Sequence, residues 1–496
     1  MSEIISAIPS VFNWQTILGM VAGNAVGIVF GAIPGFTGVM AIAILLPFTF
    51  SLNTTTGIVM LFSCFCGGCF GGSITAILIG TPGAPEAAPT VFDGYPLALK
   101  GKSGKAITIA AISSCIGGMI SSILLLLFSP TVAKWTLNFA PPEYFMLGIF
   151  GISVIAGLNE GNLIIGIISG IVGVMLSLIG MDAQSGVTRF TFGNLHLYSG
   201  LNLSPIILGV FALNRIFKSF SAKGSGQDSQ HVKLSRDRLS FKEFRSCGGS
   251  IMRGTVVGSI IGAIPAAGAA IASFISYNLE KVFCRNREKL GSGIIEGVAA
   301  PEAANNAVTG TSLIPLLTLG IPGSGGAATL LGAFMMHGLS PGPFLFKNNG
   351  QTIYAIILGF IITNLVMLLV VKVFLGGFVQ VSRIPETALV SVLFVICFAG
   401  AFCNSTSVFD VLVAVITGVV AYLLTTLGVP MIPMILGFIL GPTIEKNFRN
   451  ALIMSDGSYL IFIRRPICII LIMLTVIMII GTKYMNRAVN RASKKT

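Results

Sequence analysis

Four motifs rich in proline and glycine interrupt apolar segments of the sequence. The first pair is Gly31-Ala-Ile-Pro34, followed by Gly35, Thr37 and Gly38, and its identical copy Gly262-Ala-Ile-Pro265. The second pair is Gly80-Thr81-Pro82-Gly83 and Gly320-Ile-Pro322-Gly323, the latter followed by Ser324. Proline removes a backbone donor and glycine lets the chain turn, so a membrane helix breaks at such motifs. Because the freed backbone groups are tolerated at membrane depth only beside protein or a water-filled cavity, these residues predict a shared substrate site.

Small polar and acidic residues around the breaks suit a site for an anion and a cation. The amino ends of broken helices face anions, whereas hydroxyl, amide and carboxylate oxygens can hold Na⁺ or relay H⁺. The candidates for cation coupling are Ser73, Glu86, Glu302, Asn305, Asn306 and Ser312. Other interpretations stay open: small residues can simply let helices pack closely, Glu302 can equally cap the helix that follows it, and Asp93 suits the cap of a turn at the cytoplasmic surface.

Composition places these residues in a polytopic, all-α membrane protein. Of 496 residues, 54% are hydrophobic and only 9% are charged, too few charges to cover a soluble protein of this size. Uncharged runs long enough to cross a bilayer are clearest at 107–133, 352–371 and 466–482. The net charge of +13 comes from short basic clusters between apolar segments, a pattern typical of membrane proteins rather than of nucleic-acid binding. The sequence contains neither a catalytic constellation nor a P-loop, so we expect no enzyme activity and no tightly bound cofactor.

The order of the motifs indicates an internal duplication. Pro265 follows Pro34 by 231 positions and Pro322 follows Pro82 by 240 positions, so two ordered matches occur at nearly one offset. A polar, basic stretch lies between the copies. We therefore expect a first transmembrane repeat at 1–217, a cytoplasmic basic linker at 218–248, a second repeat at 249–445, and an additional helix with a basic tail at 446–496.

The distribution of Lys and Arg predicts that the two repeats have opposite orientations. Residues 1–99 contain neither, and the first basic clusters are 100–105, the 215–253 region and 281–289. If these clusters face the cytoplasm, the first repeat begins outside and the second begins inside, which defines an inverted repeat. The carboxy-terminal end disagrees with this rule. If the basic tail at 483–495 is inside, then Lys446, Arg449, Arg464 and Arg465 lie outside.

The ordered motifs resemble those of a known family. They are Gly31-Ala-Ile-Pro-Gly-Phe-Thr-Gly38, Gly80-Thr-Pro-Gly83 with Asp93-Gly-Tyr-Pro96, Pro301-Glu-Ala-Ala-Asn-Asn306, and Gly320-Ile-Pro-Gly323 with His337-Gly-Leu-Ser-Pro-Gly342. Together they look like the large membrane subunit of tripartite tricarboxylate transporters, the TctA-type permeases. Ala266, Glu86 and Pro89 depart from the pattern and leave the choice of substrate in doubt.

The resemblance implies a multi-pass symporter of the bacterial inner membrane for citrate or other small di- or tricarboxylates. It implies a small four-helix membrane subunit and a periplasmic solute-binding protein as partners, and a cation gradient, of Na⁺ or H⁺, as the driving force. An elevator-like movement is expected by analogy with other inverted-repeat transporters. A passive anion channel, in which the breaks line a pore, is the alternative function.

Overall fold

The computed structural model describes residues 2–33, 35–158, 163–182, 184–221, 232, 234–235, 237–265, 268–381 and 386–477. The chain divides into two compact units. Unit 1 comprises Met1–Ala133 and Arg215–Asn404, and unit 2 comprises Lys134–Asn214 and Ser405–Thr496. Each unit therefore combines a part of the first sequence repeat with a part of the second.

Unit 1 holds most of the helices. In chain order they are α1 (Ser2–Val11), α2 (Trp14–Gly31), α3 (Gly38–Leu45), η1 (Leu46–Ser51), α4 (Thr54–Leu78), η2 (Pro85–Ala87), α5 (Ala88–Leu99), α6 (Ser103–Thr136), α10 (Asn214–Ser221), α11 (Phe241–Ser246), α12 (Gly248–Ala263), α13 (Gly268–Phe283), η5 (Arg287–Lys289), α14 (Ile295–Thr311), α15 (Leu313–Leu319), α16 (Gly325–Met336), α17 (Leu345–Val381) and α18 (Glu386–Ser405). The last residues of α6 and α18 and the first residue of α10 belong to unit 2.

Unit 2 consists of α7 (Pro141–Leu158), α8 (Leu163–Ser177), β1 (Gly180–Met181), β2 (Thr188–Arg189), η3 (Leu195–Leu197), α9 (Leu203–Ile207), the π-helical turn η4 (Leu208–Leu213), α19 (Val408–Thr426), α20 (Met431–Met454) and α21 (Ile461–Arg464). The two short strands pair antiparallel, with Gly180 opposite Arg189 and Met181 opposite Thr188. Helix α20 packs against both α7 and α8.

Six described helical spans are long and apolar enough to cross a membrane. They are Trp14–Gly31, Thr54–Leu78, Ser103–Thr136, Leu203–Phe220, Leu345–Gln380 and Val408–Thr426. The prediction of an all-α polytopic membrane protein is confirmed. Of the uncharged runs singled out above, 107–133 lies in α6 and 352–371 lies in α17, while 466–482 is described only as far as residue 477.

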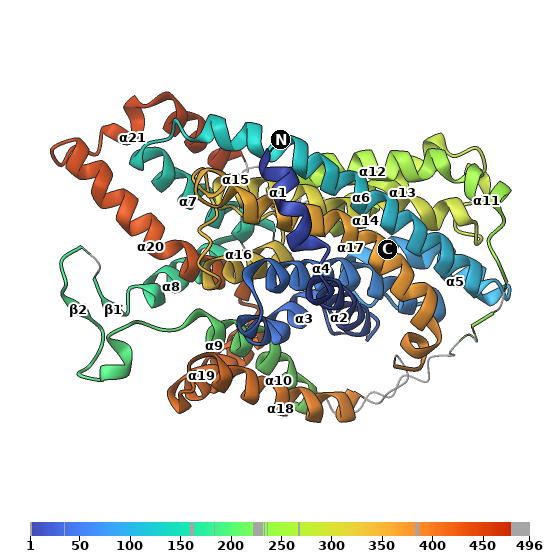
Figure 1. Ribbon diagram of the computed structural model, residues 1–496, viewed down its shortest axis with the longest axis horizontal. Coiled ribbons are helices and arrows are strands. Elements are labelled where there is room, and N and C mark those ends of the chain that lie inside the picture. Colours follow the sequence, from blue (N-terminus) through green and yellow to red (C-terminus); the bar gives the residue numbers. More distant parts are fainter. Residues whose placement is uncertain are drawn as a thin grey trace. The chain divides into compact units, whose positions relative to one another are not determined.

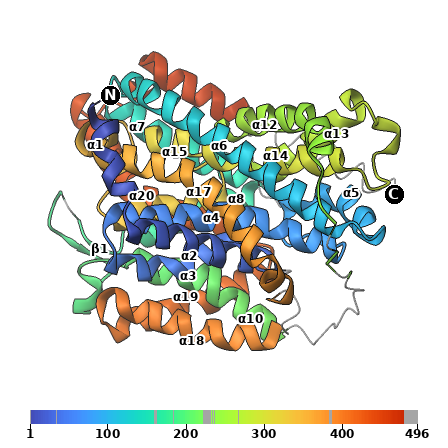
Figure 2. The same ribbon diagram turned by 45° about the vertical axis from the view of Figure 1, so that its right-hand side comes forward.

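Two pairs of helices in unit 1 pack in matching ways, at the offsets that separate the sequence motifs. Helix α2 lies along α4, and α12 lies along α14 (Figures 1 and 2). Glycines make both contacts, because a methyl group at each would lie 2.1–2.2 Å from a carbonyl oxygen of the partner helix. The pairs are Gly23 with Met60, Gly27 with Cys64, Gly254 with Ala300 and Gly258 with Ala304. Their offsets are 231 positions in the first helix and 240 in the second, the same as those of the proline motifs.

The linker predicted at 218–248 is described only in part. Residues 222–231, 233 and 236 lie outside the described residues, and Phe241–Ser246 forms α11. Glu243 joins this helix to α6 through a 2.6 Å ion pair with Lys105. The Lys100 ammonium, just before α6, donates to the carbonyl of Ser292, which follows α13 and η5. The basic groups assigned to the cytoplasmic side therefore lie together at one end of α6, α12 and α13.

Candidate functional site

Helices α4 and α14 run antiparallel through the centre of unit 1, one from each repeat. Three contacts define their register: Ser73 with Glu302, Cys69 with Asn305, and Cys66 with Thr309. Residue numbers increase along α14 as they decrease along α4, so these corresponding helices are antiparallel. An inverted repeat requires this arrangement. Every described residue of α14 from Glu296 to Thr311 is buried. The pair therefore forms a buried axis around which the four breaks are arranged.

The second break of each repeat folds back onto the helix that precedes it. Gly80 and Gly320 both end their helices at φ +73°, a left-handed conformation that favours glycine. The chain then returns until the amide of Gly83 donates to the carbonyl of Gly72 at 3.2 Å, beside the carbonyl of Gly31. In the second repeat Gly323 lies next to Ser312 and Gly262, the residues at the same offsets. Each repeat thus brings its own two breaks together.

The amino ends of α3 and α16 meet the same stretch of α4. A methyl group at Gly38 would lie 3.2 Å from the Cα of Gly68, and one at Gly326 would lie 2.3 Å from the ring of Phe65. Both helices begin with a hydroxyl cap: Thr37 accepts from the amide of Met40, and Ser324 accepts from the amide of Ala327 at 3.2 Å. Helices α3 and α16 also contact each other directly. Two helix amino ends, one from each repeat, therefore converge within one turn of α4.

The amino ends of α13 and η2 are the counterparts, in the other repeat, of the amino ends of α3 and α16. Their residues and contacts are different. Ala269 of α13 packs against Ala304 and Val308 of α14, and α13 contacts η2. Ala84 precedes η2 without a side-chain cap, and the half-buried Glu86 lies in η2 itself. The two sides of the axis therefore differ in chemistry, because one presents hydroxyl-capped helix ends and the other presents a carboxyl group.

Glu302 lies fully buried in the middle of α14, so the interpretation that it caps a following helix is wrong. Its Oε1 accepts hydrogen bonds from Ser73 and Thr90, both at 2.5 Å, and its Oε2 accepts one from Ser114 at 3.1 Å. The three hydroxyl groups come from α4, α5 and α6. Ser73 and Glu302, predicted separately from the sequence, therefore form one cluster, and Thr90 and Ser114 were not predicted. A carboxyl group held by hydroxyls at this depth suits the binding of a cation or proton.

Three other predicted cation ligands lie further along the chain from Glu302, two on α14 and one directly after it. The side-chain oxygens of Asn305 and Asn306 are buried and have no hydrogen-bond partner among the described residues. The Asn305 amide donates to the carbonyl of Cys69 at 3.1 Å, and Ser312 donates to the carbonyl of Thr309 at 3.3 Å. Unsatisfied amide oxygens are costly in a buried region and are good ligands for a hard cation.

The predicted substrate residues differ in exposure. Thr81 and Gly35 are exposed, while Pro82, Pro265, Thr37, Gly38 and Ser324 are half-buried, and Gly83, Pro322 and Gly323 are buried. Pro34 lies outside the described residues. The observed contacts join the breaks in two pairs, one pair in each repeat. A single cavity lined by all four breaks stays a prediction.

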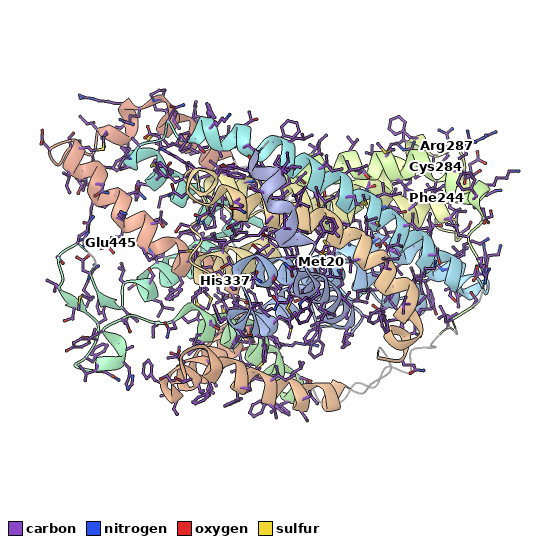
Figure 3. The ribbon with its side chains drawn as sticks, viewed as in Figure 1. Met20, Phe244, Cys284, Arg287, His337 and Glu445 are labelled. Carbon is purple, nitrogen blue, oxygen red and sulfur yellow. The ribbon has the colours of Figure 1, made fainter. Side chains whose placement is uncertain are left out.

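Two further residues anchor the outer ends of the helices that follow the second breaks. Asp93 of α5 is buried and accepts hydrogen bonds from the amides of Gly291, Gly293 and Ile294 and, at 2.8 Å, from the hydroxyl of Tyr277. It therefore caps a turn, as predicted, although the turn precedes α14. His337, which Figure 3 labels, lies at the end of α16. It bonds to Thr49 at 2.9 Å and stacks on Phe50. These anchors occupy opposite ends of the α4–α14 pair.

Arg215 is a charged residue that sequence reasoning counted with a basic region and did not single out. Arg215 lies inside the helical span Leu203–Phe220. Its guanidinium group lies beside Gly35, and its Cζ is 5.5 Å from the centre of the Phe36 ring. The signal that could have found it is a charged residue within the apolar segment 201–217.

Comparison with known proteins gives the family of the chain. The profile of the tripartite tricarboxylate transporter TctA family matches residues 17–436, which include most of both predicted repeats and all four breaks. The chain belongs to this family. An uncharacterized 52.8 kDa protein in the TAR-I ttuC' 3' region of Agrobacterium vitis is 37% identical over 445 residues, covering 90% of this chain and 88% of the relative. A second protein, in the TAR-II ttuC' 3' region of the same organism, is 37% identical over 223 residues, covering 45% of this chain and 92% of the relative. No solved structure matches the chain.

Membership in the TctA family identifies the chain as a multi-pass membrane protein of a tricarboxylate transporter system. The resemblance inferred from the motifs is therefore confirmed. Family membership also accords with the expectation of a transporter rather than an enzyme.

Proposed function

We propose that this TctA-family protein takes up small di- or tricarboxylates, such as citrate, across the bacterial inner membrane by coupling their movement to a cation. The observation that carries the proposal is the convergence of the α3 and α16 amino ends, capped by Thr37 and Ser324, on Phe65–Gly68 of α4. Helix amino ends carry partial positive charge and unpaired amide donors, so they bind anions. A carboxylate held there would contact both repeats.

The coupling cation is Na⁺ or H⁺ and binds at the Glu302 cluster or at the nearby amide oxygens. Support comes from the fully buried carboxyl group of Glu302 and from the unpaired oxygens of Asn305 and Asn306. Because Thr90 lies on α5, which follows a break, a change in the occupancy of Glu302 would alter how α5 is held. Coupling between the cation and the substrate needs an element, such as α5, whose position depends on whether the cation is bound.

We further propose that the protein works with a small four-helix membrane subunit and a periplasmic solute-binding protein, which delivers the substrate. The term tripartite in the family name supports this assembly. An elevator-like movement would fit a chain whose two units each combine parts of both repeats.

Uptake of labelled citrate into proteoliposomes, with the three proteins reconstituted together, tests the proposal. Imposing a Na⁺ gradient or a pH gradient separately would identify the coupling cation, and Glu302→Gln should abolish or change the response to that gradient. The matched control is Glu296→Gln, since Glu296 is also a buried carboxyl group of α14 but bonds to Asn286 at 3.0 Å. Flux that follows the substrate gradient alone and ignores both cations would indicate the passive channel instead.

A further inference from the structure

Glu86 is a second carboxyl group beside the Glu302 cluster. Its side chain is half-buried, and it forms no hydrogen bond or ion pair with another described residue. It lies in η2, shortly after the break at Gly80–Gly83, and η2 packs against α4, α13 and α14. A carboxyl group without a partner is costly in such apolar surroundings and is usually retained for a function.

The helix that begins at η2 directs Glu86 toward Glu302. Thr90 follows Glu86 by four residues in the continuous helical stretch of η2 and α5. Side chains four residues apart share one face of a helix, with their Cβ atoms about 5–6 Å apart. Thr90 donates to Oε1 of Glu302 at 2.5 Å. The face that carries Glu86 is therefore the face that meets Glu302.

Helix α4 holds the same stretch from the other side. A methyl group at Gly72 would lie 3.3 Å from the Cβ of Ala87, the residue after Glu86. Ser73, the residue after Gly72, donates to Oε1 of Glu302 at 2.5 Å. Contacts on both sides of Glu86 thus lead to one oxygen atom of Glu302.

Neither carboxyl group has a basic partner among the described residues. The nearest elements carry two basic side chains that are already paired, Lys105 with Glu243 and Arg253 with Glu280. The other titratable groups on α4, α5, α6, α13 and α14 are Cys69, Asp93, Tyr95, Cys115, Tyr277, Lys281 and Glu296. Two carboxylates so close together in apolar surroundings repel each other strongly, so the pair must hold a proton or another cation.

The other repeat shows that the packing of these helices does not require polar groups. Three phenylalanines stand at the corresponding positions, at offsets of 240, 244 and 246 residues: Phe62 for Glu302, Phe334 for Thr90 and Phe360 for Ser114. The Phe62 ring lies 5.8 Å from that of Phe334 and 4.9 Å from that of Phe360, and all three are fully buried. Helix α16, the counterpart of α5, contains no acidic residue. The carboxyl pair is therefore retained for its chemistry rather than for the fold.

The spacing of the oxygen atoms around Glu302 favours a proton. Its Oε1 lies 2.5 Å from both the Ser73 and the Thr90 hydroxyl oxygens. Ligand oxygens around a hard metal cation, at bond lengths of about 2.4 Å, stand about 3.4 Å apart, so these three oxygens are too close together to surround one. A proton needs no such space, because a carboxyl group that gains one keeps its hydrogen bonds to the hydroxyls.

We propose that the coupling ion is a proton, which Glu86 exchanges with water and Glu302 holds during transport. This inference rests on the proposed function and identifies its cation and the path of that cation. A proton taken up by the Glu86 carboxylate passes to the hydroxyl oxygen of Thr90 as Thr90 gives its own proton to Oε1 of Glu302. Glu86 is then ionised again and Glu302 is neutral, and the reverse sequence releases the proton.

Proton entry with citrate tests this path in proteoliposomes that contain the reconstituted tripartite assembly. A pH indicator inside the vesicles would report protons, and labelled citrate would report the substrate. The variants are Glu86→Gln, Glu86→Asp and Glu302→Gln. The matched control is Glu288→Gln, because Glu288 is an exposed carboxyl group of unit 1 that lies in η5.

We expect citrate to acidify the vesicle interior with the wild type and the control, whereas Glu302→Gln should carry no protons with citrate. Glu86→Gln should keep the ratio of protons to citrate but lower the initial rate by about 100-fold, as loss of a positioned proton donor does. Its rate should also rise more steeply as the outside pH falls, because water must then protonate the Glu302 cluster directly. Glu86→Asp should recover part of the rate.

Infrared spectra of the purified full-length protein give a readout that is independent of transport. A band of a protonated carboxyl group should grow as the pH falls in the wild type, and Glu302→Gln should lack that component. Unfolding temperatures of all variants would be compared, and the Glu86 variants keep the test valid if Glu302→Gln does not fold.

A wild-type rate and pH profile in Glu86→Gln would overturn the role of Glu86. An equal loss in Glu86→Gln and Glu86→Asp with an unaltered pH profile would also overturn it, because that result indicates a structural effect. Citrate uptake that follows a Na⁺ gradient without proton entry would overturn the proton as the coupling ion and leave the proposed function intact. A wild-type assembly that takes up no carboxylate under any gradient would overturn the proposed function itself.

Discussion

Replacing Gly83 by alanine tests whether the second break of the first repeat must pack as the structure shows. A methyl group at Gly83 would lie 2.1 Å from the carbonyl oxygen of Gly31, and 2.9 Å from both the Cα of Gly72 and the hydroxyl of Thr75. Ordinary contacts between carbon and oxygen begin at about 3.3 Å, so the break must move by about 1.2 Å. Two of these neighbours are backbone atoms and cannot rotate away. Overpacking of this kind costs about 1–3 kcal/mol, and a displacement of about 1 Å at a functional site can reduce a rate by about 100-fold.

The same change at Gly323 should be milder, although the two positions are related by the repeat. There the methyl group would lie 2.9 Å from the Cβ and 3.3 Å from the Cα of Ser312 and 3.4 Å from the carbonyl of Gly262, so only one contact is shorter than about 3 Å. We therefore expect Gly83→Ala to reduce citrate uptake at least tenfold and Gly323→Ala to reduce it less. Larger side chains, as in Gly83→Leu or Gly323→Leu, should abolish uptake.

Gly376→Ala is the matched control, because a methyl group at Gly376 of α17 would meet no atom within 4 Å. The assay is initial uptake of labelled citrate in cells, normalised to the amount of protein in the membrane fraction. Unfolding temperatures in detergent would separate loss of transport from loss of folding. If Gly83→Ala transports at the wild-type rate with normal abundance, the close packing of this break is not required and the reasoning fails.

Three further predictions concern the caps, an anchor and the linker. Thr37→Val and Ser324→Ala should each raise the KM for citrate uptake by about 3- to 10-fold, since each removes a cap and a hydroxyl at the converging helix ends; an unchanged KM would remove that residue from the site. Asp93→Asn should lower the unfolding temperature of the protein by several degrees, because an amide cannot accept all the hydrogen bonds that the carboxylate accepts, and an unaltered melting curve would contradict this. The Lys105 ammonium and then the Ser240 amide lower the pKa of Glu243 to about 2, below the value of about 4.3 for a free glutamate, so the ion pair stabilises α11 above pH ~4.3 and is lost as the pH falls toward 2. Faster hydrogen exchange of α11 across that interval would verify it, and a flat profile, or the same profile in Lys105→Gln, would refute it.

The sequence predicted the duplication because glycine and proline act locally. A break or a close helix contact requires these residue types wherever it occurs, so both copies keep them at fixed offsets. The predicted pairs at 31–34 and 262–265 accordingly end α2 and α12, and Gly80 and Gly320 share one backbone conformation. Ser73 and Glu302 could also be singled out from the sequence, because each is a polar residue within an apolar or small-residue segment.

The partners of Glu302 could not be predicted, because they depend on how distant helices pack. Thr90 and Ser114 are ordinary helix residues in the sequence, and only the packing of α5 and α6 around α14 brings them to one carboxyl group. Arg215 was missed for a related reason: one basic residue near the start of a basic stretch was counted with that stretch, although it lies inside the helical span. The sequence pattern therefore identifies residues that are unusual in apolar segments. Tertiary packing determines which of these residues contact one another.

The arginines at the carboxy-terminal end illustrate the same limit of a rule based on charge alone. Arg449 forms a 2.8 Å ion pair with Asp182, and Arg465 forms one with Glu143, also at 2.8 Å. Glu143 lies at the start of α7 and Asp182 follows the end of α8, and these two ends of a helical hairpin lie on one side of a bilayer. The contacts therefore place Arg449 and Arg465 on the same side as each other, which the positive-inside rule could not decide, because that rule is a statistical bias over loops whereas an ion pair fixes the position of an individual side chain.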